Sequence, residues 1–229
     1  MAWSRRSRRS PIAERRLDPD RKTALEALPA SVRPAFATLW NLDLTLADVV
    51  ATTTEPGLGA IRLAWWRERL EELDSGAVPA EPRLSAIARQ LLGRGIAGKE
   101  LSVLEDAWLP LLEPLPWGKA ASDGLRLRGR ILFGIGARLL GGDPRDAEAA
   151  GALWSLVDGA HHCSDPTSRD YLLDEARKAL KEARPAPRKL RPLTVLAALA
   201  ARDFHCSDGG VGRVGAALLH RLTGRFSSG

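Results

Sequence analysis

Cysteine is scarce in this chain, which contains only Cys163 and Cys206 among its 229 residues. Two cysteines cannot build a disulfide framework, and these two lack the paired spacing of a zinc site, so we interpret both as reduced thiols. Long apolar runs are also missing, because the longest, such as residues 193–201, are far shorter than the roughly 18 residues that a membrane-spanning helix needs. A secretory signal requires an apolar segment after its positively charged start, and no such segment follows the first arginines. These absences predict a cytoplasmic protein without a transmembrane segment.

Aromatic residues make up only 5% of the chain, and β-branched residues are sparse. The abundant residues are Ala, Leu, Arg and Glu, which favour helices. A hydrophobic content of 45% in a chain of this length is enough for one full core. The sequence shows no internal repeat and no linker long enough to divide it. We therefore predict an all-α fold, in which residues 17–229 form a single-domain bundle of about ten helices.

Positive charge is concentrated at the start of the chain. Residues 1–16 contain six arginines and one glutamate, and so carry +5 of the net charge of +6. The nearly neutral remainder offers no broad basic face of the kind that nucleic-acid-binding folds use. We interpret residues 1–16 as a disordered arm, either without a role or contacting an anionic membrane surface or RNA. The arginines that could make this contact are Arg5, Arg6, Arg8 and Arg9.

Capping residues and helix breakers define the predicted helices. Asp18 before Pro19 and Asp165 before Pro166 have the pattern of an N-cap followed by a first-turn proline. Glycines and prolines mark most of the helix ends. The predicted helices cover residues 18–29, 31–50, 56–74, 82–92, 99–112, 119–140, 144–162, 166–184, 192–204 and 211–222.

Two adjacent tryptophans distinguish the helix predicted at residues 56–74. We expect Ile61, Trp65 and Leu70 to form its apolar side, with Trp66 turned about 100° away. The helix is then contacted from two directions, as an inner helix of a bundle is. Because Arg62 precedes Trp66 by four residues, we expect Trp66 to border a cavity, where the arginine stacks on the ring and faces an anionic ligand.

Three glycines interrupt the helix predicted at residues 119–140. Each of Gly129, Gly134 and Gly136 costs a helix about 0.5–1 kcal/mol relative to alanine. Glycines of this kind are typical of places where another helix or a ligand comes close, and the sequence leaves both alternatives open.

The segment 55–67, EPGLGAIRLAWWR, resembles a sequence block of the squalene/phytoene synthase family, especially of its small, divergent bacterial branch. Weaker similarity extends to residues 33–37, 40–44, 132–134 and 139–142 and to Trp154. The resemblance implies the isoprenoid synthase fold. It also implies similarity to a mitochondrial respiratory complex I assembly factor, which has a domain of this type and is short of the family's aspartate motifs.

Active members of the family bind Mg²⁺-complexed prenyl diphosphates through two DxxxD motifs. Carboxylates four residues apart lie on one helix face and can ligate bridging magnesium ions together. In this chain Asp43 and Asp48 are five residues apart, about 140° around a helix, and so cannot form such a pair. The resemblance places the second motif near residues 160–165, where Asp165 is the only carboxylate. We therefore regard Asp43, Asp48, Asp158 and Asp165 as remnants, and assign no catalytic residue.

Two other pairs of possible metal ligands are four residues apart in the sequence. The literal DxxxD at Asp170 and Asp174 lies beyond the expected position, among basic residues typical of a solvated, salt-bridged face. Asp158 and His162 are also four apart, but histidine is a poor magnesium ligand. This pair indicates an ordinary polar contact or, alternatively, a site for a different metal.

The sequence thus predicts a non-catalytic squalene/phytoene synthase-like protein that binds an isoprenoid or lipid-like ligand, or a partner protein, with peripheral contact to a membrane as an option. We expect no cofactor. The alternative is an active prenyltransferase that condenses prenyl diphosphates with Mg²⁺ and displaced aspartates. The residues predicted to line a ligand pocket are Trp40, Arg62, Trp66, Gly134, Trp154 and His162.

Overall fold

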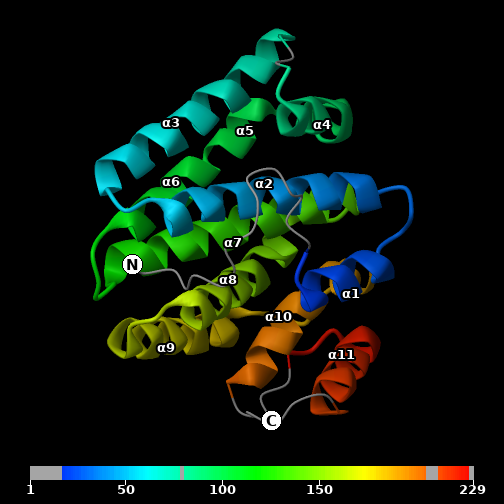
Figure 1. Cartoon of the computed structure of the whole chain (residues 1–229). Coiled ribbons are helices and arrows are strands. Elements are labelled where there is room, and N and C mark those ends of the chain that lie inside the picture. Colours follow the sequence, from blue (N-terminus) through cyan, green and yellow to red (C-terminus); the bar gives the residue numbers. More distant parts are fainter. Residues whose placement is uncertain (1–16, 78–79, 205–210, 227–229) are drawn as a thin grey trace.

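The computed structural model describes residues 17–77, 80–204 and 211–226, so the arm of residues 1–16, with its predicted membrane or RNA contact, lies outside the described residues. The described residues form α-helices and short 3-10 helices, which confirms the predicted all-α, isoprenoid synthase-like bundle (Figure 1). The α-helices are α1 (Pro19–Ala27), α2 (Arg33–Thr52), α3 (Pro56–Glu72), α4 (Pro82–Gln90), α5 (Gly98–Ser102), α6 (Leu104–Trp108), α7 (Lys119–Leu139), α8 (Glu148–His162), α9 (Pro166–Glu182), α10 (Arg191–Asp203) and α11 (Val211–Thr223). The 3-10 helices are η1 (Leu73–Ser75), η2 (Leu92–Arg94), η3 (Leu109–Leu112), η4 (Pro144–Asp146) and η5 (Arg188–Leu190). Within these ranges, no helix has both the length and the apolar character needed to cross a bilayer.

Helix α2 runs through the middle of the bundle. In Figure 1 it separates α3, α4 and α5 from α7 and α8, and α9, α10 and α11 lie beyond α8. One face of α2 is buried along its whole length because apolar residues recur every three or four positions. This face consists of Phe36, Leu39, Trp40, Leu46 and Val50, with Asp43 in the same row.

Helices α7 and α8 cross with their backbones in contact. A Cβ atom added to Gly129 of α7 would lie 2.0 Å from the carbonyl oxygen of Gly151 in α8, and one added to Gly151 would lie 2.2 Å from the carbonyl oxygen of Gly129. Any larger residue at either position would force the helices apart. Gly136 is also closely packed, with its Cβ position 2.7 Å from Leu193, whereas Gly134 has only an ordinary contact with Pro144. Helix packing therefore accounts for two of the three glycines noted in the sequence.

The prediction of one continuous helix at residues 99–112 is wrong, because the structure divides this segment into α5, α6 and η3. Ser102 lies at the first break, where its hydroxyl donates to the carbonyl of Lys99 at 2.9 Å and so competes with helical hydrogen bonding. Pro110 lies at the second break, where its ring cannot donate the next backbone hydrogen bond. The segment that packs against α3 therefore consists of three short helices in place of one.

The buried face of α3 also differs from the prediction. Ile61 is 67% exposed and Trp65 is 43% exposed, whereas Trp66 is only 7% exposed. The reason lies in the helical spacing, since Ile61 and Leu70 are nine residues apart and point to opposite sides of the helix. The buried residues, spaced by four, three and four positions, are Gly59, Leu63, Trp66 and Leu70.

His220 attaches α11 to α10. Its ring is 1% exposed, with Nε2 2.9 Å from the hydroxyl of Thr194 and Nδ1 3.0 Å from the carbonyl oxygen of Arg225. Because a carbonyl only accepts, Nδ1 carries a proton. Burial lowers the pKa of His220, the hydrogen bond to Arg225 opposes this shift, and the charge of Arg191 adds to it. The ring therefore favours its neutral form in the folded protein.

The exposures on α3 lead to a first prediction. Trp66→Ala should lower the free energy of unfolding by about 3–5 kcal/mol, because it leaves a large cavity in the core. Trp65→Ala should cost only about 1 kcal/mol, since much of that ring already faces solvent. The two rings contact each other edge to face at 5.1 Å, so each variant is the control for the other. Equal losses in urea denaturation would contradict the assignment of the buried face.

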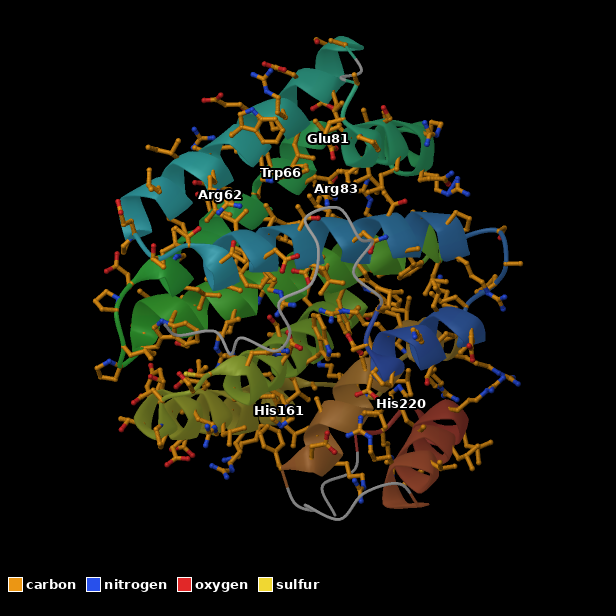
Figure 2. All side chains as sticks on the ribbon, viewed as in Figure 1. Arg62, Trp66, Glu81, Arg83, His161 and His220 are labelled. Atoms are coloured by element: carbon orange, nitrogen blue, oxygen red, sulfur yellow. The ribbon has the colours of Figure 1, made fainter. Side chains whose placement is uncertain are left out.

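A second prediction concerns pH. The pKa of His220 in the folded protein lies below its usual 6.5. The contribution of the neutral ring to the free energy of unfolding is therefore complete above about pH 6.5, and it is lost as the pH falls through the folded pKa. Between pH 7 and pH 5 the wild-type protein should therefore lose stability relative to His220→Gln, which does not titrate. The matched control is His161→Gln, which replaces an exposed histidine and leaves the buried ring of His220 in place (Figure 2). Urea denaturation across this range measures the two stabilities. If the free energies of unfolding of the wild type and His220→Gln changed in parallel with pH, the prediction would be wrong.

Candidate functional site

An arginine lies in the interior of the bundle, on the buried face of α7. Arg128 has a side chain that is 1% exposed and shares its helix face with Leu125, Leu132 and Ile135. Its guanidinium binds the carboxylate of Asp43 on α2 at two points, with Nε donating to Oδ1 at 2.7 Å and Nη2 donating to Oδ2 at 2.7 Å. A two-point pair of this kind fixes both the distance and the orientation of the partners.

The same guanidinium also binds α8. Its Nη1 donates to Oδ2 of Asp158 at 2.8 Å and to the hydroxyl of Ser155 at 3.2 Å. Ser155 and Asp158 follow Gly151 by four and seven residues, so they share its helix face. The contact between Gly129 and Gly151 therefore brings these acceptors within reach of Arg128.

Two tryptophans and a second arginine complete the group. The guanidinium carbon of Arg128 lies over the ring of Trp108 at 4.7 Å and over that of Trp154 at 4.8 Å. The buried Arg21 of α1 also lies over Trp154, at 4.9 Å, and donates to Oδ2 of Asp43 at 3.1 Å. Aromatic faces attract such cations where water is excluded. We call Arg21, Asp43, Trp108, Arg128, Trp154 and Asp158 the Arg128 cluster.

The cluster favours the ionised forms of Arg128 and Asp158. Burial disfavours the charged form of Arg128, but the attraction of Asp43 and Asp158 outweighs it and raises the pKa of the guanidinium. Burial would raise the pKa of Asp158, but Arg128, and secondarily Arg21 and His162, lower it well below its usual range. Asp158 is therefore ionised at neutral pH and unsuited to act as a general acid or base.

The carboxylates of the cluster do not fit a magnesium–diphosphate site. Both oxygens of the fully buried Asp43 accept from guanidinium groups, and Oδ2 of Asp158 accepts from Arg128. A magnesium ion would need these oxygens in an octahedral shell, and Arg128 lies between them. Within the ranges that the structure describes, no group of three or more His, Cys, Asp or Glu side chains is arranged to hold a metal ion.

The other two remnant aspartates lie elsewhere. Asp48 is partly buried on α2, about 140° around the helix from Asp43. Asp165 is the N-cap of α9, where its carboxylate accepts from the backbone N–H of Ser168 at 2.7 Å and from its hydroxyl at 2.6 Å. These hydrogen bonds lower the pKa of Asp165. Its role in the structure is therefore that of a helix cap.

The literal DxxxD lies on the exposed side of α9. Asp170 and Asp174 are both exposed, and Asp174 forms an ion pair with Arg177 one turn later. This agrees with the solvated, salt-bridged face expected from the sequence.

The six residues predicted to line a ligand pocket are distributed over the molecule. Trp154 belongs to the Arg128 cluster, whereas Trp40 is buried on α2 with its ring edge-on to Phe36 at 5.6 Å. Nδ1 of His162 lies 2.7 Å from the backbone carbonyl oxygen of Asp158 and 3.6 Å from its carboxylate. The Asp158–His162 pair is thus held mainly through the backbone.

The two predicted pocket residues on α3, both labelled in Figure 2, differ in exposure. Trp66 is buried, whereas the exposed Arg62 donates to the hydroxyl of Thr53 at the end of α2, at 3.0 Å. Gly134 on α7 packs near Pro144. A pocket of about 330 Å³ does lie between α1, α10 and α11, but none of the six predicted residues lines it.

Three members of the cluster, Arg21, Trp108 and Arg128, were not identified as site residues from the sequence. A signal for Arg128 was available, because it falls in the apolar row of Leu125 and Leu132. The same holds for Arg21, which precedes the buried Ala24 and Leu28 by three and seven residues. A charged residue in an apolar row indicates a buried ion pair, although the row does not reveal the partner.

The comparisons with known proteins bear on the first part of this site. Residues 15–100 match the model of a family described as squalene/phytoene synthase, which confirms the resemblance drawn from the sequence. That segment, α1 to the start of α5, carries the sequence of the squalene/phytoene synthase family and includes Arg21 and Asp43 but not Arg128 or Asp158. No curated protein and no solved structure matches the chain.

The cluster leads to a third prediction. Arg128→Met removes the shared partner of two carboxylates and should destabilise the protein by about 3–5 kcal/mol at pH 7. Adding Asp43→Asn to this variant should recover part of the loss. The control is Arg138→Met, which breaks an exposed pair with Glu100 and should cost about 1 kcal/mol or less.

The pH dependence of this loss has a definite sign. The lowered pKa of Asp158 stabilises the wild type above the usual carboxyl pKa of about 4, and that stabilisation is lost as the pH falls. The stability difference between wild type and Arg128→Met should therefore narrow below about pH 4. A difference that stays constant down to pH 3 in chemical denaturation would show that Arg128 acts by packing alone.

Proposed function

We propose that this protein is a non-catalytic member of the squalene/phytoene synthase family, which acts by binding rather than by condensing prenyl diphosphates. The observation that carries the proposal is that the guanidinium of Arg128 donates two hydrogen bonds to Asp43 and one to Asp158. A buried guanidinium supplies the positive charge that bound magnesium supplies in active members of the family. The remnant carboxylates then hold a side chain instead of a metal.

Electrostatics support the proposal. Removing Arg128 from between the carboxylates would leave buried charges unpaired, which costs several kcal/mol. A metal ion would have to replace the arginine and also recruit further oxygen ligands, because this chain lacks the i, i+4 carboxylate pair in both expected places. The guanidinium of Arg128 also lies over the rings of Trp108 and Trp154, and these contacts further stabilise it in this position.

A binding role also agrees with the surface of the molecule. Helix α3 exposes Leu58, Ile61 and Trp65 on one side, and α11 exposes a further apolar row. Exposed apolar patches of this kind are typical of binding surfaces. The proposed partners are an isoprenoid or lipid-like molecule or a protein, as in the assembly-factor role that the sequence resemblance implies.

The fourth prediction tests the absence of catalysis. Purified protein incubated with farnesyl or geranylgeranyl diphosphate and Mg²⁺ should release no pyrophosphate above the rate of a buffer blank. An active squalene or phytoene synthase in the same assay serves as the positive control. Release that disappears in Asp43→Ala or Asp158→Ala, with helicity retained by circular dichroism, would establish the prenyltransferase alternative and overturn the proposal.

A binding measurement makes the test independent of turnover. Magnesium together with an unreactive thiodiphosphate analogue should leave the melting temperature unchanged, because the carboxylates are already occupied by Arg128. A ligand present at about 100 times its dissociation constant would add about 2.7 kcal/mol, a rise of several degrees. Such a rise, dependent on Asp43, would contradict the proposal even without turnover.

A further inference from the structure

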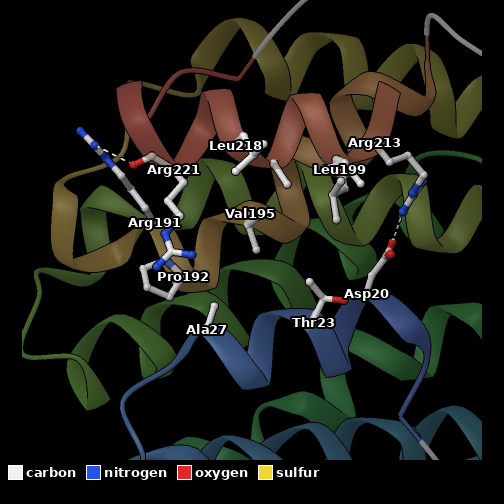
Figure 3. A pocket seen from close by; sticks show the side chains of 12 residues that line it. Asp20, Thr23, Ala27, Arg191, Pro192, Val195, Leu199, Arg213, Leu218 and Arg221 are labelled. Carbon is white, nitrogen blue, oxygen red and sulfur yellow. Dashed lines mark hydrogen bonds and ion pairs between the residues drawn. The ribbon is translucent and has the colours of Figure 1, made fainter. Parts of the chain in front are cut away.

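A pocket lies between α1, α10 and α11, on the side of the bundle away from α3 (Figure 1). Its volume of about 330 Å³ is at the lower end of the range of about 300–1,000 Å³ that is typical of small-molecule sites. Apolar groups form most of its wall, contributed mainly by Ala27, Pro192, Val195, Leu199, Val214, Ala217 and Leu218. The polar lining residues lie chiefly at its two ends (Figure 3).

The two ends of the pocket differ in charge. At one end Arg213 forms ion pairs with Asp20 and Asp203, so its positive charge is compensated. At the other end Arg191 donates to the carbonyl oxygens of Ala186, Arg221 and Leu222, all of which are uncharged acceptors. The second end therefore carries a cation without a carboxylate partner among these contacts.

Arg221 adds a second positive charge at that end. Figure 3 shows its guanidinium directed from α11 toward Pro192, at the same end as Arg191. Among the described residues no carboxylate forms an ion pair with Arg221, and the described part of α11 contains no acidic residue. An anionic group at this end would be attracted mainly by Arg221, because Arg191 already donates to carbonyl oxygens at the end of α11.

We propose that this pocket binds a single-chain amphiphile with a carboxylate head, of the medium-chain fatty acid type. The carboxylate lies against Arg221, and the chain lies along Val195 and Leu199 toward the neutral Arg213–Asp20 pair. From Pro192 to Leu199 α10 rises by about 10 Å, which limits the slot to a chain of moderate length. The proposal concerns a site separate from the Arg128 cluster, so it does not depend on the loss of catalysis.

The fifth prediction is a titration of the full chain with decanoate, below its micelle concentration, in an isothermal calorimeter. Decanoate should bind at one site per chain, and octanoate should bind more weakly by about fourfold for each methylene removed. Decanol, which has the chain without the charge, should bind more weakly than decanoate. Equal affinity for decanol and decanoate would overturn the assignment of Arg221.

Matched variants on α11 separate the pocket from the general surface. Arg221→Gln should weaken decanoate binding by about fivefold and leave decanol binding unchanged, whereas the exposed Arg225→Gln should have no effect. Leu218→Asp should abolish binding of both compounds, whereas Leu222→Asp should not, because Leu222 does not line the pocket. Both leucines are largely exposed, at 56% and 77%, so neither substitution threatens folding.

Equal losses in Leu218→Asp and Leu222→Asp would show adsorption to the outer face of α11 and overturn the pocket. The same conclusion would follow if phosphatidylglycerol vesicles sedimented with the protein while decanoate failed to bind. Arg221→Gln should bind decanoate more weakly and, like the wild type, should release no pyrophosphate from prenyl diphosphates. These two results together separate the pocket proposal from the proposed non-catalytic function.

Discussion

The contact of Arg128 with Asp43 and Asp158 is the interaction on which the rest of the bundle depends. It joins α2, α7 and α8 through one side chain, and Arg21 extends the connection to α1. A buried ion pair is costly to assemble and still more costly to break, because any missing partner leaves a charge without water. The helices must therefore meet at fixed distances, and the glycine contact between α7 and α8 sets the shortest of them.

This arrangement gives the buried carboxylates hydrogen-bond partners within the chain itself. The bundle has an inward-facing carboxylate on α2 and another on α8, and the guanidinium groups of Arg128 and Arg21 balance their two charges. A fold can persist while the function of its central site changes, because packing constrains the helices and charge balance constrains only a few residues. The pocket beneath α11 lies outside this centre, and the α10 and α11 parts of its wall belong to a part of the chain that the family match does not include.

The sequence predicted the fold well because caps, prolines and helical periodicity are local signals. Nearly every helix end was found within a few residues, and the failures have local causes, such as Pro110 and the wrong choice of face on α3. The site was harder to predict. The rows of apolar residues contain Asp43 and Arg128, but residues 85 positions apart become partners only through the packing of three helices.

The Arg128 cluster also bears on the order in which the chain can fold during synthesis. Asp43 emerges from the ribosome long before Arg128, whose two hydrogen bonds to it are shorter than the one from Arg21. Until α7 has been made, α2 cannot reach its final buried position without leaving its carboxylate only partly compensated. The segment 15–100 that carries the family sequence thus contains a buried carboxylate whose two shortest hydrogen bonds come from outside it, and its charge is fully compensated only after the second half of the chain has been made.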